Sequence, residues 1–192
     1  EQDALHGTFH PTSMCKLTGA LDEQGNVIGL HMRLSGQSIL AGLRPEALVE
    51  GRDPNVFQGL NAQGPEGQFG YDIPNLLIDH AMRNPPFRPG FWRGVNNNQN
   101  AIYLECFIDE MAHAAGQDPL EFRRKMMKNY PKHLAVLNAV AEKAGWGQPT
   151  APGVFRGISQ HMGYGSYVAA VAEVSVSDKG KLKIHRIVAA TD

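Results

Sequence analysis

The chain of 192 residues carries a formal net charge of −1, and 42% of its residues are hydrophobic against 19% that are charged. This balance indicates one globular domain or two small ones, and it excludes an intrinsically disordered chain. The small net charge excludes whole-chain attraction to nucleic acid or anionic membranes. No apolar run is long enough to cross a bilayer, and no basic segment followed by an apolar one marks a leader, so neither a cytoplasmic nor a periplasmic location is favoured.

The first element that the sequence predicts is a β-hairpin formed by residues 14–21 and 27–34. Apolar residues alternate along its second half, and the Gly-containing segment 22–26 supplies the turn. Residues 36–70 are the least regular part of the chain, with prolines and glycines throughout and one short helix expected at 45–49. We interpret this excursion as a variable surface insertion, with a functional or subunit-contacting loop as the alternative.

The middle of the chain is predicted to be mostly helical. Residues 73–82 fit a strand or a short helix, and we favour a strand because the proline-rich segment 84–89 that follows is extended. Apolar residues then recur every three or four positions over 101–115, which is typical of an amphipathic helix. The charged pair Asp109 and Glu110 is interpreted as part of its solvated face rather than as acid–base machinery.

Two further helices follow. The helix 118–129 begins with Asp118 as its cap and Pro119 at its first position, a strong start signal. The next spans 131–144, with Gly145 as its expected stop. The cysteines have no metal-type spacing: Cys106 is expected as a small buried side chain within a helix, and a disulfide to Cys15 is the unsupported alternative.

The last segment returns to β structure after the linker 146–153. Residues 157–167 interleave glycine with Tyr, Ser and His, and we interpret them as a tight connection that needs positive φ, with a phosphate-binding nest as the alternative. Residues 174–188 predict a second hairpin. The fold class is therefore α/β in an α+β arrangement, with hairpins flanking a three-helix middle, divided into domains 1–150 and 151–192. Because the chain begins without Met and ends on a strand-like run, we expect an internal fragment of a longer protein.

The most informative stretch is the segment 89–115, in which a polar turn precedes the first helix of the middle region. The turn holds one arginine, one glycine, four asparagines and one glutamine between residues 93 and 100. Backbone N–H groups and the dipole at a helix N-terminus favour an anion, and Arg93 adds a planar fork of donors. The residues by themselves fit either a cradle for an anion or cofactor, or an ordinary capped helix with a surface arginine.

Residues 91–125 resemble a signature of the molybdenum hydroxylases, the family of xanthine oxidase and aldehyde oxidoreductase. In the large subunit of that family an aromatic-Arg-Gly turn precedes a Gln and a helix of the type A-x-x-x-E-x-x-x-[DE]-E-[LM]-A, which the run from Ala101 fits. A second helix of the type D-P-[LE]-E-[FV]-R fits the run from Asp118. Residues 1–11 and 157–174 are similar to the isoquinoline 1-oxidoreductase beta subunit branch of the family.

The resemblance implies that this chain is part of a molybdopterin-binding domain. It implies that Arg93, Gly94 and Val95 line the molybdenum pocket, and that Gln99 supports the turn or the cofactor. The implied cofactor is molybdopterin, in its cytosine dinucleotide form, held by the longer protein, with none expected on this fragment alone. The implied partner is a subunit with [2Fe–2S] clusters that takes up the electrons. No residue is expected to ligate a metal directly, because the eight histidines form no cluster of ligand type.

Departures from the family pattern limit what this chain can do. Val95 stands where xanthine oxidase relatives have a Phe that faces an aromatic substrate, and residues 96–98 replace Gly-Gly-Pro, so a purine-like substrate is in doubt. The G-E-x-G context of the family's catalytic Glu and the upstream Gly-Gly-x-x-Gly loop are both missing. We therefore predict no catalytic residue in this fragment and no activity of the chain alone. The longer protein is expected to hydroxylate an N-heterocycle or oxidise an aldehyde with water-derived oxygen; the alternative is a non-catalytic interaction or small-molecule-binding module.

Overall fold

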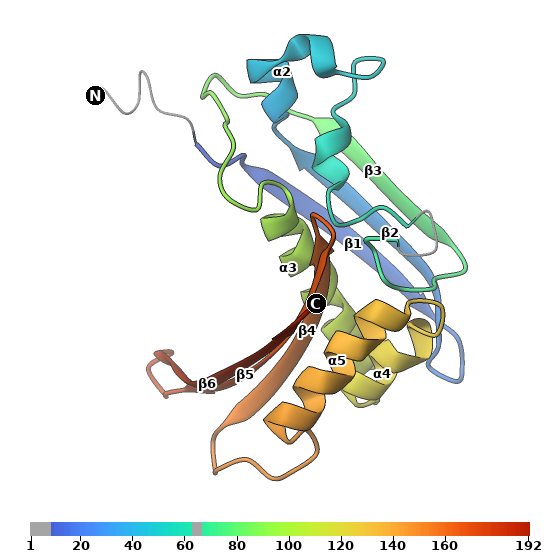
Figure 1. Cartoon of the computed structure of the whole chain (residues 1–192), viewed down its shortest axis with the longest axis vertical. Coiled ribbons are helices and arrows are strands. Elements are labelled where there is room, and N and C mark those ends of the chain that lie inside the picture. Colours follow the sequence, from blue (N-terminus) through green and yellow to red (C-terminus); the bar gives the residue numbers. More distant parts are fainter. Residues whose placement is uncertain (1–8, 63–66) are drawn as a thin grey trace. The chain divides into compact units, whose positions relative to one another are not determined.

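The computed structural model describes residues 9–62 and 67–192 (Figure 1). The part of the sequence resemblance that falls on residues 1–8 lies outside the described residues. The chain divides into two compact units: the first contains residues up to Asn61 together with Ile73–Phe107, and the second contains Ala62–Asp72 together with Ile108–Asp192. The second unit extends across the expected boundary at 150/151, which stays a prediction about the longer protein.

The first unit is built on a three-stranded sheet in the order β1-β2-β3. Strands β1 (Ser13–Leu21) and β2 (Val27–Gly36) pair antiparallel, which confirms the first predicted hairpin. Strand β3 (Leu76–Met82) pairs parallel to β2, so the strand interpretation of this segment is confirmed. One face of β2 forms the core because its alternate residues are buried; these are Leu30, Met32 and Leu34.

The excursion between β2 and β3 is more ordered than its composition suggests. It contains α2 (Ile39–Leu43) and the 3₁₀ turns η1 (Pro45–Ala47) and η2 (Pro54–Phe57). Sequence reasoning expected only one short helix here, at 45–49. The buried Asp53 carboxylate organises the segment, since it accepts hydrogen bonds from Ser38 Oγ at 2.7 Å and from the backbone N–H groups of Leu40 and Asn55.

The long helix α3 (Asn97–Ala114) contributes residues to both units. It begins four positions before the predicted start at residue 101, because the asparagine run forms its first turn. The predicted apolar stripe is confirmed by three buried side chains: Leu104, Ile108 and Met111. One expectation on this helix was wrong, because Cys106 is exposed; its neighbour Glu105 is buried.

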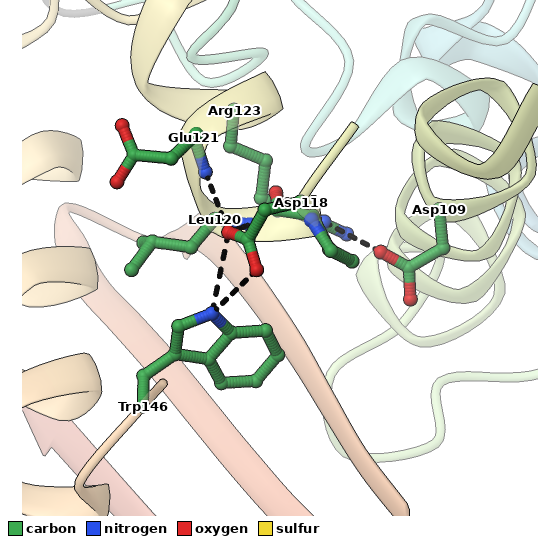
Figure 2. A network of polar contacts seen from close by, with 7 residues as sticks. Asp109, Asp118, Leu120, Glu121, Arg123 and Trp146 are labelled. Atoms are coloured by element: carbon green, nitrogen blue, oxygen red, sulfur yellow. Dashed lines mark hydrogen bonds and ion pairs between the residues drawn. The ribbon is translucent and has the colours of Figure 1, made fainter. Parts of the chain in front are cut away.

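Helix α4 (Pro119–Met126) starts as predicted but ends three residues before the expected Asn129. One oxygen of the Asp118 carboxylate accepts hydrogen bonds from the backbone N–H groups of Leu120 and Glu121, both at 3.0 Å. The indole Nε1 of Trp146 donates to the same carboxylate at 3.0 Å, a contact that the sequence does not predict (Figure 2). The cap therefore also anchors the segment that follows the third helix of the middle region.

The second unit ends in an antiparallel sheet of β4 (Phe155–Gly163), β5 (Ser166–Val176) and β6 (Leu182–Thr191). Helix α5 (Pro131–Ala144) packs against all three strands. The hairpin predicted over 174–188 is confirmed, and the α+β class holds.

The glycine-rich run 157–167 is mostly strand rather than loop. Only Tyr164 and Gly165 form the turn, and both have positive φ, at 56° and 85°. The expected helix stop is also found, because Gly145 lies in the left-handed region at φ 68°. Within the ranges that the structure describes, no helix is both long and apolar enough to span a bilayer.

Candidate functional site

The four residues predicted to line a pocket lie in the turn before α3 and in the first turn of that helix. The turn closes through a hydrogen bond from the Val95 N–H to the Trp92 carbonyl at 2.8 Å. Gly94 has φ 90°, and a Cβ at this position would lie 2.1 Å from Asn98 Oδ1, so glycine is required here. Val95 has φ 50°, which is a rare conformation for a β-branched residue and indicates local strain.

Two buried asparagines hold this turn against the excursion. The Asn96 side chain donates to the Asn55 carbonyl at 2.8 Å, and the Asn100 side chain donates to the carbonyls of Val56 and Gln58, both at 2.9 Å. The Asn96 N–H is also bonded, to Gln58 Oε1 at 3.2 Å. These asparagines are tethers rather than ligand donors. The strain at Val95 can persist because the surrounding bonds over-determine the turn.

Gln99 braces the same turn from inside the first unit. Its Nε2 donates to Asn96 Oδ1 at 2.7 Å, while its Oε1 is buried with no hydrogen-bond partner among the described residues. Gln99 borders a small, partly open cavity of about 10 Å³ that Gln37 and His80 also line. Burial lowers the pKa of His80 below its ordinary value and outweighs the opposing effect of the Gly36 carbonyl, so this ring is neutral at pH 7.

Arg93 differs from these anchored groups because its side chain is exposed. Its carbonyl accepts a hydrogen bond from Asn98 Nδ2 at 2.8 Å, which fixes the backbone. Its guanidinium has no hydrogen bond or ion pair to any described residue. The neighbouring Trp92 is 65% exposed, and Phe91 carries the guanidinium of Arg44 at 5.4 Å from its ring centroid. The turn thus presents an uncommitted cation beside an exposed aromatic ring.

The donor set of this turn fits an anionic or polarised oxygen and does not fit a metal ion. Arg93 supplies charged N–H donors on a fixed backbone, whereas the amide groups around it are committed to internal bonds. No group of three or more His, Cys, Asp or Glu side chains of metal-binding type occurs in the described part of the chain. The residues are therefore compatible with the anionic periphery of a molybdopterin cofactor, with Arg93 as the group that would hold it and Gln99 as a brace.

The acidic pair Asp109 and Glu110 on α3 has a structural role. Asp109 accepts a hydrogen bond from Arg123 at 2.5 Å, and Glu110 is exposed. The solvated-face interpretation therefore holds for Glu110, while Asp109 is partly solvated and forms an ion pair with the buried Arg123.

Comparison with known proteins finds curated relatives of this chain. No family model matches it. It is 25% identical over 199 residues to the isoquinoline 1-oxidoreductase subunit beta of Brevundimonas diminuta, an alignment that covers 100% of this chain and 25% of that protein. It is 28% identical over 193 residues to the aldehyde oxidoreductase molybdenum-binding subunit PaoC of Escherichia coli O157:H7, with 93% of this chain and 24% of the relative covered.

The fold has a solved counterpart as well. The aldehyde oxidoreductase of Desulfovibrio gigas superposes with a TM-score of 0.56 over 96% of this chain and 22% of that chain, at 18% identity, which supports the fold alone. The chain spans about a quarter of the length of the curated relatives it matches. These relatives bear out the resemblance that the sequence carries: the chain is similar to part of the molybdenum-binding subunits of molybdenum hydroxylases.

Proposed function

We propose that this chain is part of the molybdopterin-binding subunit of an oxidoreductase that hydroxylates an N-heterocycle or oxidises an aldehyde. The substrate classes follow the printed names of the relatives, which include isoquinoline 1-oxidoreductase and aldehyde oxidoreductase subunits. When bound, molybdopterin supplies the two-electron redox chemistry and the site at which water-derived oxygen is activated. The proposal extends to the cytosine dinucleotide form of the cofactor and to a [2Fe–2S] partner subunit that accepts the electrons.

In this proposal Arg93, Gly94, Val95 and Gln99 form part of the wall of the pocket, and the catalytic base lies outside this chain. The observation that carries the proposal is the strained, heavily tethered turn with an uncommitted guanidinium. A cation held in place before the reaction stabilises negative charge on oxygen without reorganisation, which is the basis of electrostatic catalysis. Val95 is smaller than an aromatic side chain, so this wall leaves room without offering a stacking surface.

The test is Arg93→Ala in the longer protein. Turnover should fall by about 100-fold, as for the loss of one pre-organised donor, while the melting temperature stays unchanged because the side chain is exposed. Arg93→Lys should recover only part of the activity, because a point charge lacks the planar fork. Arg88→Ala is the matched control, since Arg88 is also an exposed arginine on the preceding segment. Normal turnover in Arg93→Ala would remove Arg93 from the site.

A second candidate is a small-molecule-binding module without catalysis. A hollow of about 320 Å³ beside β3 favours it, lined by Phe57, Ile78, His80 and Met82 among others. Its nearby carboxylates are already bonded within the protein, Asp53 in the excursion and Asp79 to His31 and Arg33. A blot of source-cell extract separates the candidates: a product several times larger than this chain supports the oxidoreductase, and a product of 192 residues supports the module.

A further inference from the structure

The sheet of the second unit has two faces, and α5 covers only one of them. On the covered face the side chains are almost fully removed from solvent; these are Ile158, Tyr167, Ala169 and Val171. Because side chains alternate along a strand and directly opposed residues share a face, the registers define the other side. This outer face has three polar residues toward one end, Ser159, His161 and Thr191, and is otherwise apolar: Phe155, Val168, Ala170, Ala172, Val174, Val176, Leu182, Ile184, Ile187 and Ala189.

The large residues of the outer face are exposed to an extent that is unusual for apolar side chains gathered in one place. Their exposed fractions are 68% for Phe155, 59% for Val176, 57% for Leu182, 57% for Ile184 and 61% for Ile187. They lie together because Val174 pairs with both Phe155 and Ile184, and Val176 pairs with Leu182. Contiguous apolar surface of this kind marks an interaction site. Toward the middle of the sheet the face is lined by smaller residues, Gly157, Ala170, Ala172 and Ala189, which form a lower area beside the larger side chains.

The side-chain pattern of strand β6 indicates that another layer of structure covers the outer face. Arg186 points to the side of α5, where it donates to the Lys143 carbonyl at 3.1 Å and opposes Glu173 on β5. Its neighbour Ile187 therefore points away from the helix. In an antiparallel sheet with one solvated face, polar residues face water and apolar residues face the packed layer. In β6 the arrangement is reversed, because the charged Arg186 faces α5 and the apolar Ile187 faces the open side. This pattern indicates a second apolar layer against the outer face.

We propose that the outer face is the packing site of an amphipathic helix from the part of the subunit that lies outside this chain. The relatives supply the length: this chain matches 25% of one and 24% of another, so about three quarters of each has no counterpart here. The lower area of small residues beside the larger side chains suits the side-chain ridge of a helix. A helix with an apolar stripe fits best, because the outer face is mainly apolar on all three strands.

A second copy of this chain is disfavoured along the edge of the sheet. Pairing two β6 edges would bring the basic residues Lys183 and Arg186 near their copies, and like charges in opposed positions are destabilising. The proposed helix from the longer protein packs across the outer face and does not bring these like charges together. Self-association is therefore an outcome that the test must distinguish from the proposed intramolecular packing.

The experiment measures thiol alkylation at single cysteines placed on the outer face. With Cys15 and Cys106 replaced by serine, Ile184→Cys and Leu182→Cys report on the face, and Lys179→Cys in the neighbouring turn is the exposed control. We expect all three to react rapidly in the 192-residue chain. In the longer protein the two face positions should react at least 10-fold more slowly, with Lys179→Cys unchanged. Circular dichroism checks that each variant folds, and the second face position serves if one does not.

Three results would overturn the proposal. Equal reaction rates in the chain and in the longer protein would leave the face open in both. Slow reaction in the 192-residue chain together with a dimer in sedimentation would assign the face to a second copy. Slow reaction in a monomeric 192-residue chain would mean that this chain covers its own face. The alkylation rate does not depend on cofactor or turnover, so failure of this proposal is distinguishable from failure of the proposed oxidoreductase function.

Discussion

The fully buried Arg123 donates a hydrogen bond to the Asp109 carboxylate at 2.5 Å and another to the Pro119 carbonyl at 3.1 Å (Figure 2). The pair joins the C-terminal half of α3 to the first turn of α4. The Asp109 side chain is 39% exposed, so water reaches one partner and not the other. Removing the carboxylate therefore takes one hydrogen-bond partner from a fully buried guanidinium, which costs more than the pair itself contributes.

Asp109→Ala should lower the free energy of unfolding by about 2 kcal/mol, less than for a fully buried pair because Asp109 is partly solvated. Asp109→Asn should cost less, because its amide oxygen can still accept the hydrogen bond from Arg123. Urea titration followed by Trp146 fluorescence measures both. Glu110→Ala, one residue along the same helix, is the exposed control and should change stability by less than about 0.5 kcal/mol. An Asp109→Asn variant less stable than Asp109→Ala would contradict this account.

Gly70 lies against the buried ring of His133, and the two should not tolerate a methyl group between them. His133 Nε2 donates to the Gly67 carbonyl at 3.0 Å, and its Nδ1 lies 2.6 Å from Gln160 Oε1, so the ring is fixed on both sides. A Cβ on Gly70 would lie 2.7 Å from Nδ1. Gly70→Ala should therefore destabilise the second unit by about 3 kcal/mol, through strain at positive φ and displacement of the ring.

Gly180→Ala separates these two causes. Gly180 has the same φ of 73° as Gly70, but a Cβ there would meet nothing within 4 Å. Its substitution should cost about 1 kcal/mol, which is the backbone cost alone. Thermal unfolding of both variants provides the comparison. Equal losses would show that the His133 ring can shift without penalty.

The pKa of His161 gives the second unit a pH dependence. Burial, assisted by the neighbouring His133, lowers this pKa from 6.5 to about 4. The unfolded chain therefore binds a proton between about pH 6.5 and pH 4 that the folded chain does not bind. Stability contributed by neutral His161 is fully present above pH 6.5 and is lost as the pH falls toward 4, with a slope of at most about 1.4 kcal/mol per pH unit.

The measurement is the urea midpoint at several pH values between 4 and 7 for the parent chain and for His161→Gln. Carboxylates titrate in the same range in both proteins, so the difference between the two curves isolates the histidine. The curves should converge as the pH is lowered. Parallel curves over the whole range would mean that His161 keeps an ordinary pKa in the folded protein.

The periodic elements of this fold were predictable because the local pattern and the tertiary role agree. Helix α4 is the clearest case: Asp118 was expected to cap it, and the structure shows two backbone hydrogen bonds to that carboxylate. Helix α2 was missed because Asp53, a carboxylate on a distant part of the excursion, completes its N-terminus. The burial of Cys106 was predicted wrongly because residue spacing locates the centre of the apolar stripe on α3 but not its edges. A helix position at the edge of such a stripe can be either buried or exposed.

The residues of the candidate site were also predictable only in part. Arg93 and Gly94 were recognisable from the aromatic-Arg-Gly pattern, and the requirement for glycine has a direct cause in Asn98. The roles of Asn96 and Asn100 could not be predicted, because their partners are backbone carbonyls of Asn55, Val56 and Gln58, some forty residues earlier. Such contacts depend on tertiary placement and leave no spacing signal. The asparagine run itself was the available hint, since it is unusual at a helix start unless its side chains are bonded.

Val95 offers a test of whether strain in the turn is retained for function. A β-branched residue at φ 50° costs on the order of 1–3 kcal/mol, whereas asparagine tolerates this region because its short polar side chain bonds locally. Val95→Asn should therefore raise the free energy of unfolding by about 1 kcal/mol. Val49→Asn is the matched control, because Val49 is 60% exposed and is not among the residues with positive φ; it should be neutral or destabilising.

The same substitution in the longer protein connects this strain to the site. If the strained backbone at Val95 is needed to hold the Arg93 backbone in its functional position, Val95→Asn should be more stable and less active than the parent. A normal melting transition of the variant would rule out damage to the fold. Equilibrium unfolding and turnover, measured on the same preparation, give both quantities. A Val95→Asn variant that loses stability as Val49→Asn does would show that the turn carries no strain at this residue, and its geometry would then be an ordinary consequence of the asparagine tethers.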